Sequence, residues 1–149
     1  MWNTLEPEIV ARLPRPADAN QAASEAGGTT LANDVVKWKT TIDKLLEIRL
    51  LEYDFDGQGS LAPPDGLVDS AMILAIMLRQ LGARAPDWTI ATLNESVLLQ
   101  WDWPSGASLE VEVLQPNLAE VFVHEPGKTG ESFTIHGTAD SLAAISAVR

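Results

Sequence analysis

The chain has 149 residues, of which 46% are hydrophobic, and this suits one folded domain or a smaller domain with a tail. Its formal net charge of −11 excludes a surface that attracts nucleic acid or anionic lipid, because Lys and Arg supply the attraction to phosphate. The absence of cysteine excludes disulfides, thiolate nucleophiles and zinc–thiolate sites. A basic protein partner or a cation fits this charge, although an acidic surface also serves solubility alone.

The sequence does not predict an association with a membrane. Residues 1–6 lack a basic stretch followed by an apolar run, so no secretory signal is expected. The longest apolar run, Ala71–Leu78, is far shorter than the roughly 20 residues that span a bilayer. We expect a cytoplasmic protein.

The first 30 residues differ in composition from the rest of the chain. Residues 1–13 space apolar side chains in a way that allows a short amphipathic helix. Residues 14–30 are rich in Pro, Ala and Gly and contain no large apolar residue, which predicts a flexible linker. The chain therefore divides into an N-terminal segment with its linker, 1–30, and a single domain, 31–149. The tethered segment either docks onto another protein or subunit, or folds back on its own domain.

The first helix of the domain is predicted over residues 33–53. Asn33 or Asp34 is suited to cap its N-terminus. Apolar residues recur at helical spacing and predict the stripe that faces the core. These residues are Val35, Trp38, Ile42, Leu45, Leu46 and Leu50.

The second helix is predicted over residues 66–81. Pro63 and Pro64 cannot lie in a helix interior, so they hold its entry extended. Asp65 is the natural N-cap and Gly82 the natural C-terminal stop. The helix is apolar on nearly every side, which indicates burial on several sides. We expect it to lie between the sheet and the first helix, or to face a partner.

After Pro86 apolar and polar residues alternate with a period of two, as they do in strands. Turn-forming residues, for example at 104–106 and 116–117, separate the runs. Short strands joined by tight turns predict an antiparallel meander, so the fold class is α+β, with two helices packed on a four- or five-stranded sheet. Residues 138–148 are suited to a last short helix. The predicted strands cover residues 88–93, 97–103, 109–113, 118–124 and 132–135.

The segment between the two helices, residues 54–65, contains the one arrangement with a recognisable chemistry. It places side-chain oxygens at the spacings of an EF-hand calcium loop, with Gly59 at the position that needs glycine and with helices on both sides. The candidate metal ligands are Asp54, Asp56, Gln58, Ser60 and Asp65.

Several features of this segment oppose calcium binding. Gln58 replaces the usual Asp or Asn, Asp65 is shorter than the usual bidentate Glu, and Pro63-Pro64 prevents the second helix from starting inside the loop. The sequence contains no second EF-hand to pair with. The alternative is a glycine-rich connector whose Asp residues turn and cap the chain. Calcium is the only cofactor that the sequence suggests.

The same segment resembles a hinge found in a family of small uncharacterised bacterial proteins. Members read approximately Trp-Asp-Gly-x-Gly-Ala, then a Pro pair, an apolar helix, a strand rich in Trp or Phe, and an acidic β-strand. The resemblance covers about residues 45–125 in the same order, with Phe55 where the family usually has Trp. It implies the order of the fold and no activity, and it argues against calcium because the family hinge usually lacks the first acidic ligand. The matching pieces are Phe55–Gly59, Pro63-Pro64, Val68–Leu81, Gln100-Trp101 and Leu109–Val113.

The other titratable residues form no recognisable active site. His124 and His136 lie on or after neighbouring strands and could meet, but exposure at strand ends is the simpler interpretation. Three glutamates are expected to share one sheet face with Asp102, and alternating carboxylates usually form a solvated face rather than an acid–base pair. These glutamates are Glu110, Glu112 and Glu120.

Together these features predict a non-enzymatic, acidic protein-interaction module that docks onto or neutralises a protein partner, in the manner of an antitoxin or an immunity protein. The partner is expected to be a protein, with a basic one favoured, and neither nucleic acid nor a membrane. Homo-oligomerisation is also compatible with the sequence. The alternative function is a small calcium-binding domain that uses residues 54–65. An enzyme with carboxylate or histidine chemistry is a third hypothesis, which no motif supports.

Overall fold

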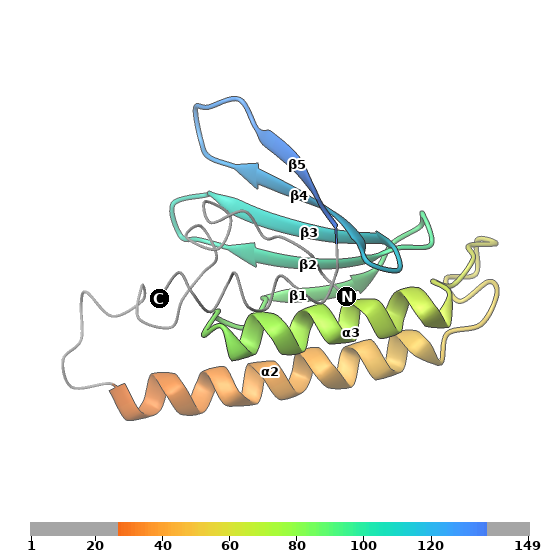
Figure 1. The fold of residues 1–149 in the computed structure, drawn as a ribbon, viewed down its shortest axis with the longest axis horizontal. Coiled ribbons are helices and arrows are strands. Elements are labelled where there is room, and N and C mark those ends of the chain that lie inside the picture. The colour runs from red at the N-terminus through yellow and green to blue at the C-terminus, as the bar shows by residue number, and fades with distance from the viewer. Residues whose placement is uncertain (1–26, 137–149) are drawn as a thin grey trace.

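The computed structural model describes residues 27–136, and the side chains of residues 32–136. Within this range two helices are followed by a five-stranded antiparallel sheet, which confirms the predicted α+β fold (Figure 1). The predicted amphipathic segment, 1–13, and the predicted last helix, 138–148, lie outside the described residues. The elements are α2 (Gly27–Arg49), α3 (Asp65–Gln80), β1 (Trp88–Ala91), β2 (Val97–Asp102), β3 (Ser108–Gln115), β4 (Leu118–His124) and β5 (Glu131–His136).

The sheet is a simple meander, in which each strand pairs with the next in the order β1-β2-β3-β4-β5. Tight turns join the strands, and residues such as Asn117 (φ 63°) and Gly127 (φ 78°) adopt the left-handed conformation that these turns need. The alternation of residues along each strand separates an apolar inner face from an outer face. The inner face consists mainly of Val97, Leu99, Trp101, Leu109, Val111, Val113, Ala119, Val121 and Ile135, which are all buried.

Both helices lie on the inner side of the sheet. They pack against each other, and α2 contacts β1 while α3 contacts β2 and β3. Figure 1 shows the helices side by side, with β1 close to them and β5 farthest away. Two buried indoles hold the connection between α3 and β1 onto this core. Trp38 Nε1 donates to the carbonyl oxygen of Ala83 (3.2 Å), and Trp101 Nε1 donates to that of Arg84 (2.8 Å).

The helix α2 differs from its prediction at both ends. It begins at Gly27, so residues 27–30, which were assigned to the predicted linker, belong to the helix. Asn33 and Asp34 therefore lie inside the helix rather than at its cap. The carboxylate of Asp34 instead accepts a hydrogen bond from the backbone N–H of Ala85 (2.9 Å). The helix ends at Arg49, before residues 50–53, which were predicted to be helical.

The buried stripe of α2 is also rotated from the predicted one. Trp38 and Leu45 are buried as predicted, but Val35, Leu46 and Leu50 are exposed. Thr41 and Ile48 are buried in their place. The reason is that α2 faces both β1 and α3, and the residues on its outward side receive no cover from either element.

The helix α3 follows its prediction more closely. It starts at Asp65, which makes no side-chain capping bond, so the predicted N-cap is wrong. Gly82 ends the helix as predicted, with a φ of 78° that favours glycine. The helix packs against the sheet and α2, but Ile73 and Ile76 are exposed, so its apolar surface is not covered all round. No helix in the described range is long and apolar enough to cross a membrane.

Candidate functional site

The outer face of the sheet collects the carboxylates of the strands. Glu112 and Glu120 are direct cross-strand partners, and Glu110 lies on the same face of β3, two residues from Glu112. Asp102 lies on this face at the end of β2, so the predicted grouping is confirmed. The five strands contain no Lys or Arg. A sheet face that contains several carboxylates, on strands without Lys or Arg, presents a negative electrostatic potential to solvent.

Exposed apolar side chains lie beside these carboxylates. The register pairs Trp88 with Gln100 and Ile90 with Leu98, on the β1 and β2 side of the face. Phe122 lies opposite Glu110 on β4 and is exposed. The combined surface is called the outer sheet face below. It consists of Trp88, Ile90, Leu98, Asp102, Glu110, Glu112, Glu120 and Phe122.

Hydrogen bonds orient several side chains of the outer sheet face. Trp88 Nε1 donates to one carboxylate oxygen of Asp102 (2.9 Å), and Gln100 Nε2 donates to the other (2.8 Å). The hydroxyl of the buried Ser96 donates to the carboxylate of Glu112. These bonds restrict the conformations that the side chains of Asp102 and Glu112 adopt.

A second polar cluster lies where the α3–β1 connection meets the end of β2. Asp87 accepts hydrogen bonds from Arg84 Nη1 (2.8 Å), from the backbone N–H of Asp102 (3.0 Å) and from Lys37 Nζ (3.3 Å). Burial raises the pKa of Asp87, but the Asp102 N–H and the two cations outweigh it, so the pKa is lower than 3.8. The guanidinium of Arg84 also lies over the ring of Trp103, 5.7 Å from its centroid. Residue spacing offered no signal for most of this cluster, because Lys37 and Asp102 meet Asp87 only in the fold.

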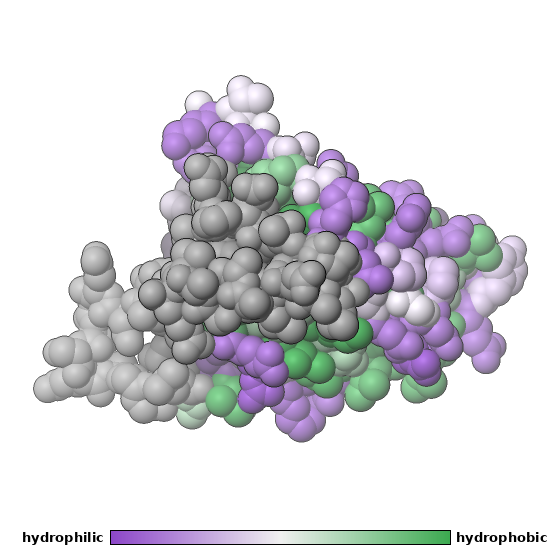
Figure 2. Space-filling model, viewed as in Figure 1, coloured by the Kyte–Doolittle hydropathy of each residue, from purple (hydrophilic) through white to green (hydrophobic). Residues whose placement is uncertain are grey.

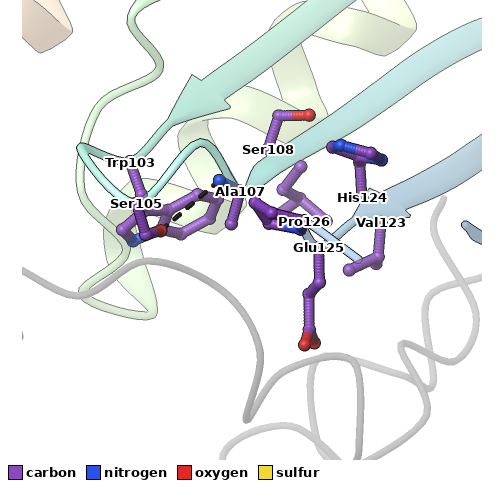
Figure 3. A pocket seen from close by; sticks show the side chains of 9 residues that line it. Trp103, Ser105, Ala107, Ser108, Val123, His124, Glu125 and Pro126 are labelled. Atoms are coloured by element: carbon purple, nitrogen blue, oxygen red, sulfur yellow. Dashed lines mark hydrogen bonds between the residues drawn. The ribbon is translucent and has the colours of Figure 1, made fainter. Parts of the chain in front are cut away.

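A pocket with a volume of about 470 Å³ lies between the β2–β3 and β4–β5 turns. Ser108 and His124 are cross-strand partners in it and project to one side, whereas Val123 and Glu125 project to the other (Figure 3). Within the described chain no hydrogen bond joins Ser108 to His124, so this pair lacks the contact of a nucleophile with its base. The pocket is lined by Trp103, Ser105, Ala107, Ser108, Leu109, Val123, His124, Glu125 and Pro126.

The two histidines do not meet. His136 is the cross-strand partner of Leu118 at the start of β4, whereas His124 ends that strand. Six residues of an extended strand separate the two positions by about 20 Å. The two histidines therefore do not share a site, and the wider hypothesis of carboxylate or histidine chemistry stays a prediction.

In the 54–65 loop, carboxylates bond to the backbone of the loop itself. The carboxylate of Asp54 accepts the N–H of Gly59, and that of Asp56 accepts the N–H of Gln58 (3.0 Å) and the hydroxyl of Ser60 (2.6 Å). The Ser60 hydroxyl and then the Gln58 N–H lower the pKa of Asp56 below 3.8. Hydrogen bonds from the backbone to Asp side chains turn and close a loop. They are the bonds expected of a glycine-rich connector, which is the alternative to a calcium loop.

The remaining candidate ligand, Asp65, lies in the first turn of α3 and has Arg49 Nη2 at 3.7 Å. Gln58 is exposed at the tip of the loop. Between residues 27 and 136 no three carboxylate or imidazole side chains come close enough together to hold a metal ion. The structure therefore does not bring Asp65 to Asp54 and Asp56, and calcium binding stays a prediction.

Comparison with protein-family models, with curated proteins and with solved structures finds no significant match to the chain. The resemblance to the small bacterial family likewise stays a prediction.

Proposed function

We propose that the chain is a non-enzymatic protein-interaction module whose outer sheet face binds a basic segment of a protein partner. The main support is the grouping of Asp102, Glu110, Glu112 and Glu120 on adjacent strands that contain no Lys or Arg. Opposite charges give specificity and speed of association, and the apolar side chains alongside them supply contact area.

The spacing of the carboxylates defines the kind of segment that fits. Glu110 and Glu112 are two residues apart on one strand, so their side chains lie about 7 Å apart, while cross-strand partners such as Glu112 and Glu120 lie about 5 Å apart. Cations that recur at this distance occur at i and i+4 of a helix. The exposed Trp88 and Phe122 would receive the apolar side chains of such a segment. An amphipathic helix with Lys or Arg beside large apolar residues meets both requirements.

The geometry of the polar groups supports a non-enzymatic role. Glu112 is bonded to Ser96, and Asp102 is bonded to Trp88 and Gln100, so these carboxylates are engaged in orienting contacts. In a narrower form of the proposal the partner is a basic protein that the chain neutralises, as antitoxins and immunity proteins do. A neighbouring gene that encodes a basic protein would support this form.

The test is a calorimetric titration of the full chain with a synthetic amphipathic peptide that has Lys on one face and Leu on the other. A peptide with Glu in place of Lys is the control ligand. We expect saturable binding of the Lys peptide that weakens with added salt. The variant E110Q/E112Q/E120Q should bind it about tenfold more weakly or worse.

A matched variant separates location from total charge. E47Q/E52Q/E95Q removes the same number of charges from exposed positions outside the outer sheet face. We expect this variant to bind the Lys peptide almost as tightly as the unmodified chain. Equal losses in the two variants would show that net charge alone attracts the peptide, and the proposal would then be wrong.

A further inference from the structure

The outward surface of the two helices is a second candidate interface. It consists of Val35, Ile42 and Leu46 from α2 and of Met72, Ile73 and Ile76 from α3, and it is called the helix-pair face below. We infer that a second copy of this chain docks onto the helix-pair face and forms a symmetric dimer. This inference is independent of the function proposed for the outer sheet face.

The residues of the helix-pair face form one continuous strip. Arg49 Nε lies 2.8 Å from a carboxylate oxygen of Asp69, which places these two residues side by side on the outward side of the helix pair. Leu46 precedes Arg49 by one turn of α2, and Ile73 follows Asp69 by one turn of α3. The helices are antiparallel, since Arg49 at the end of α2 meets Asp69 near the start of α3, whereas Trp38 in the middle of α2 bonds to Ala83 beyond the end of α3. Successive turns therefore align the apolar residues along both helices.

Four of the six residues of this strip are exposed to solvent, whereas Ile42 and Met72 are half-buried against the core. The exposed fractions are 56% for Val35, 50% for Leu46, 46% for Ile73 and 44% for Ile76. Figure 2 shows hydrophobic residues among hydrophilic ones along the edge of the molecule where Figure 1 places α2 and α3. Single exposed apolar residues are ordinary, but an aligned strip on two adjacent helices is typical of an interaction site.

The distribution of charge indicates which partner fits. The two helices contain five cations and five carboxylates, so this layer has no net charge. The strands contain carboxylates and no Lys or Arg, so the outer sheet face carries negative charge. A second copy of this acidic chain is therefore repelled by the outer sheet face and is not repelled by the helix-pair face. A basic partner has the opposite preference. The charged residues of the helices are Lys37, Lys39, Lys44, Arg49 and Arg79, and Asp34, Asp43, Glu47, Asp65 and Asp69.

The equal number of cations and carboxylates on the helices suits a dimer with two-fold symmetry. In a two-fold dimer the same surface meets itself, so a face that contains both signs can pair each charge with the opposite one on the other copy. The shared length of the helices is about 24 Å and two helices are about 20 Å wide, which gives about 500 Å² on each copy. The total of about 1,000 Å² lies at the lower end of specific interfaces, so we expect a dimer that dissociates on dilution.

The test is sedimentation equilibrium of the full chain over a range of concentrations. We expect a mass that rises from 16.1 kDa toward twice this value as the concentration increases. The variants Leu46→Asp and Ile76→Asp should each weaken the dimer at least about tenfold, since each places a desolvated charge in the contact. Ile90→Asp, a similarly exposed position on the outer sheet face, is the control and should leave the dimer unchanged.

Each alternative result contradicts the inference. A mass of 16.1 kDa at every concentration would exclude the dimer. A dimer that Ile90→Asp weakens, or that neither helix variant weakens, would place the contact elsewhere. Circular dichroism checks that the variants fold, and if Ile76→Asp fails this check, Leu46→Asp still decides the question.

Discussion

Two neighbouring residues of α3 provide a direct test of how this helix is oriented. Leu74 is fully buried between α2 and the sheet, whereas its neighbour Ile73 is about half exposed. Both are aliphatic residues in the middle of one helix, so alanine changes the local helical preference only slightly at each. We therefore compare Leu74→Ala with Ile73→Ala.

The structure predicts a large difference between the two variants. Leu74→Ala removes three buried carbons, worth about 0.8 kcal/mol each, and leaves a cavity, so the free energy of unfolding should fall by about 3–4 kcal/mol. Ile73→Ala removes carbons that are only half buried and leaves no cavity, so we expect a loss of about 1 kcal/mol or less. A loss of 3–4 kcal/mol is a large part of the 5–15 kcal/mol that stabilises a typical domain.

Urea unfolding followed by circular dichroism, at one low protein concentration, measures both losses. The slope of free energy against urea should be the same in all three proteins. Equal losses, or a larger loss for Ile73→Ala, would show that α3 turns a different side to the core. At high concentration the loss for Ile73→Ala should increase if a second copy covers this residue, because association stabilises the folded state by mass action.

Three further substitutions test local features. Asp87→Asn should lower the free energy of unfolding by about 2 kcal/mol at neutral pH. Because the pKa of Asp87 in the folded protein lies below 3.8, this difference should be complete above pH 3.8 and should disappear as the pH falls below the pKa of the folded protein. Urea unfolding at several pH values measures it. Asp56→Ala should lower the melting temperature equally with calcium and with a chelator, whereas a calcium-dependent rise that only the unmodified chain shows would support the metal site. Gly82→Ala should destabilise by about 1–2 kcal/mol, because its φ of 78° strains any Cβ. Gly66→Ala, at an ordinary φ with no close neighbour, is the control and should be neutral or stabilising in the same thermal and urea experiments.

The sheet was predictable because its signals are local. Along Leu109–Val113 apolar and acidic residues alternate without a break, and the alternation assigns every side chain to a face. Residues that tolerate a positive φ, such as Asn117 and Gly127, mark the turns between the runs. Because successive strands in such a chain pair in order, the grouping of the three glutamates followed from the same pattern.

The burial pattern of α2 was not predictable from the same kind of pattern. Periodicity identifies an apolar side of a helix, but it does not say which flank of that side a second helix covers. Val35 and Leu46 continue the periodic pattern and yet lie beyond the contact with α3, while Thr41 is buried although it is polar. Thr41 can be buried because its hydroxyl donates to the carbonyl oxygen of Lys37, one turn earlier (3.1 Å).

The polar contacts of the candidate site could not be predicted from the sequence for a related reason. Asp34 was predicted to cap the helix, but its carboxylate accepts a hydrogen bond from the backbone N–H of Ala85, which is 51 residues away. Trp88 was predicted to start a strand, but the sequence gives no sign that its indole donates to the carboxylate of Asp102 at the end of β2. Such bonds depend on the relative positions of whole elements, and a single sequence gives no signal for them.

The two proposed surfaces lie on opposite layers of the molecule, and this has a consequence that can be measured. Because the helices pack on the inner face of the sheet, over β1, β2 and β3, a dimer formed through the helix-pair face would leave both outer sheet faces exposed, one on each side. Such a dimer would bind two basic segments at once, and on a surface coated with the Lys peptide its apparent affinity should exceed that of one site by about a hundredfold or more.

Leu46→Asp separates the two effects. In free solution this variant should bind the Lys peptide as tightly as the unmodified chain, because Leu46 lies on the layer opposite to the outer sheet face. On the coated surface it should dissociate faster, because only one site would remain in each molecule. If the variant lost affinity for the free peptide as well, the helix-pair face would take part in partner binding, and the assignment of one partner to each layer would be wrong.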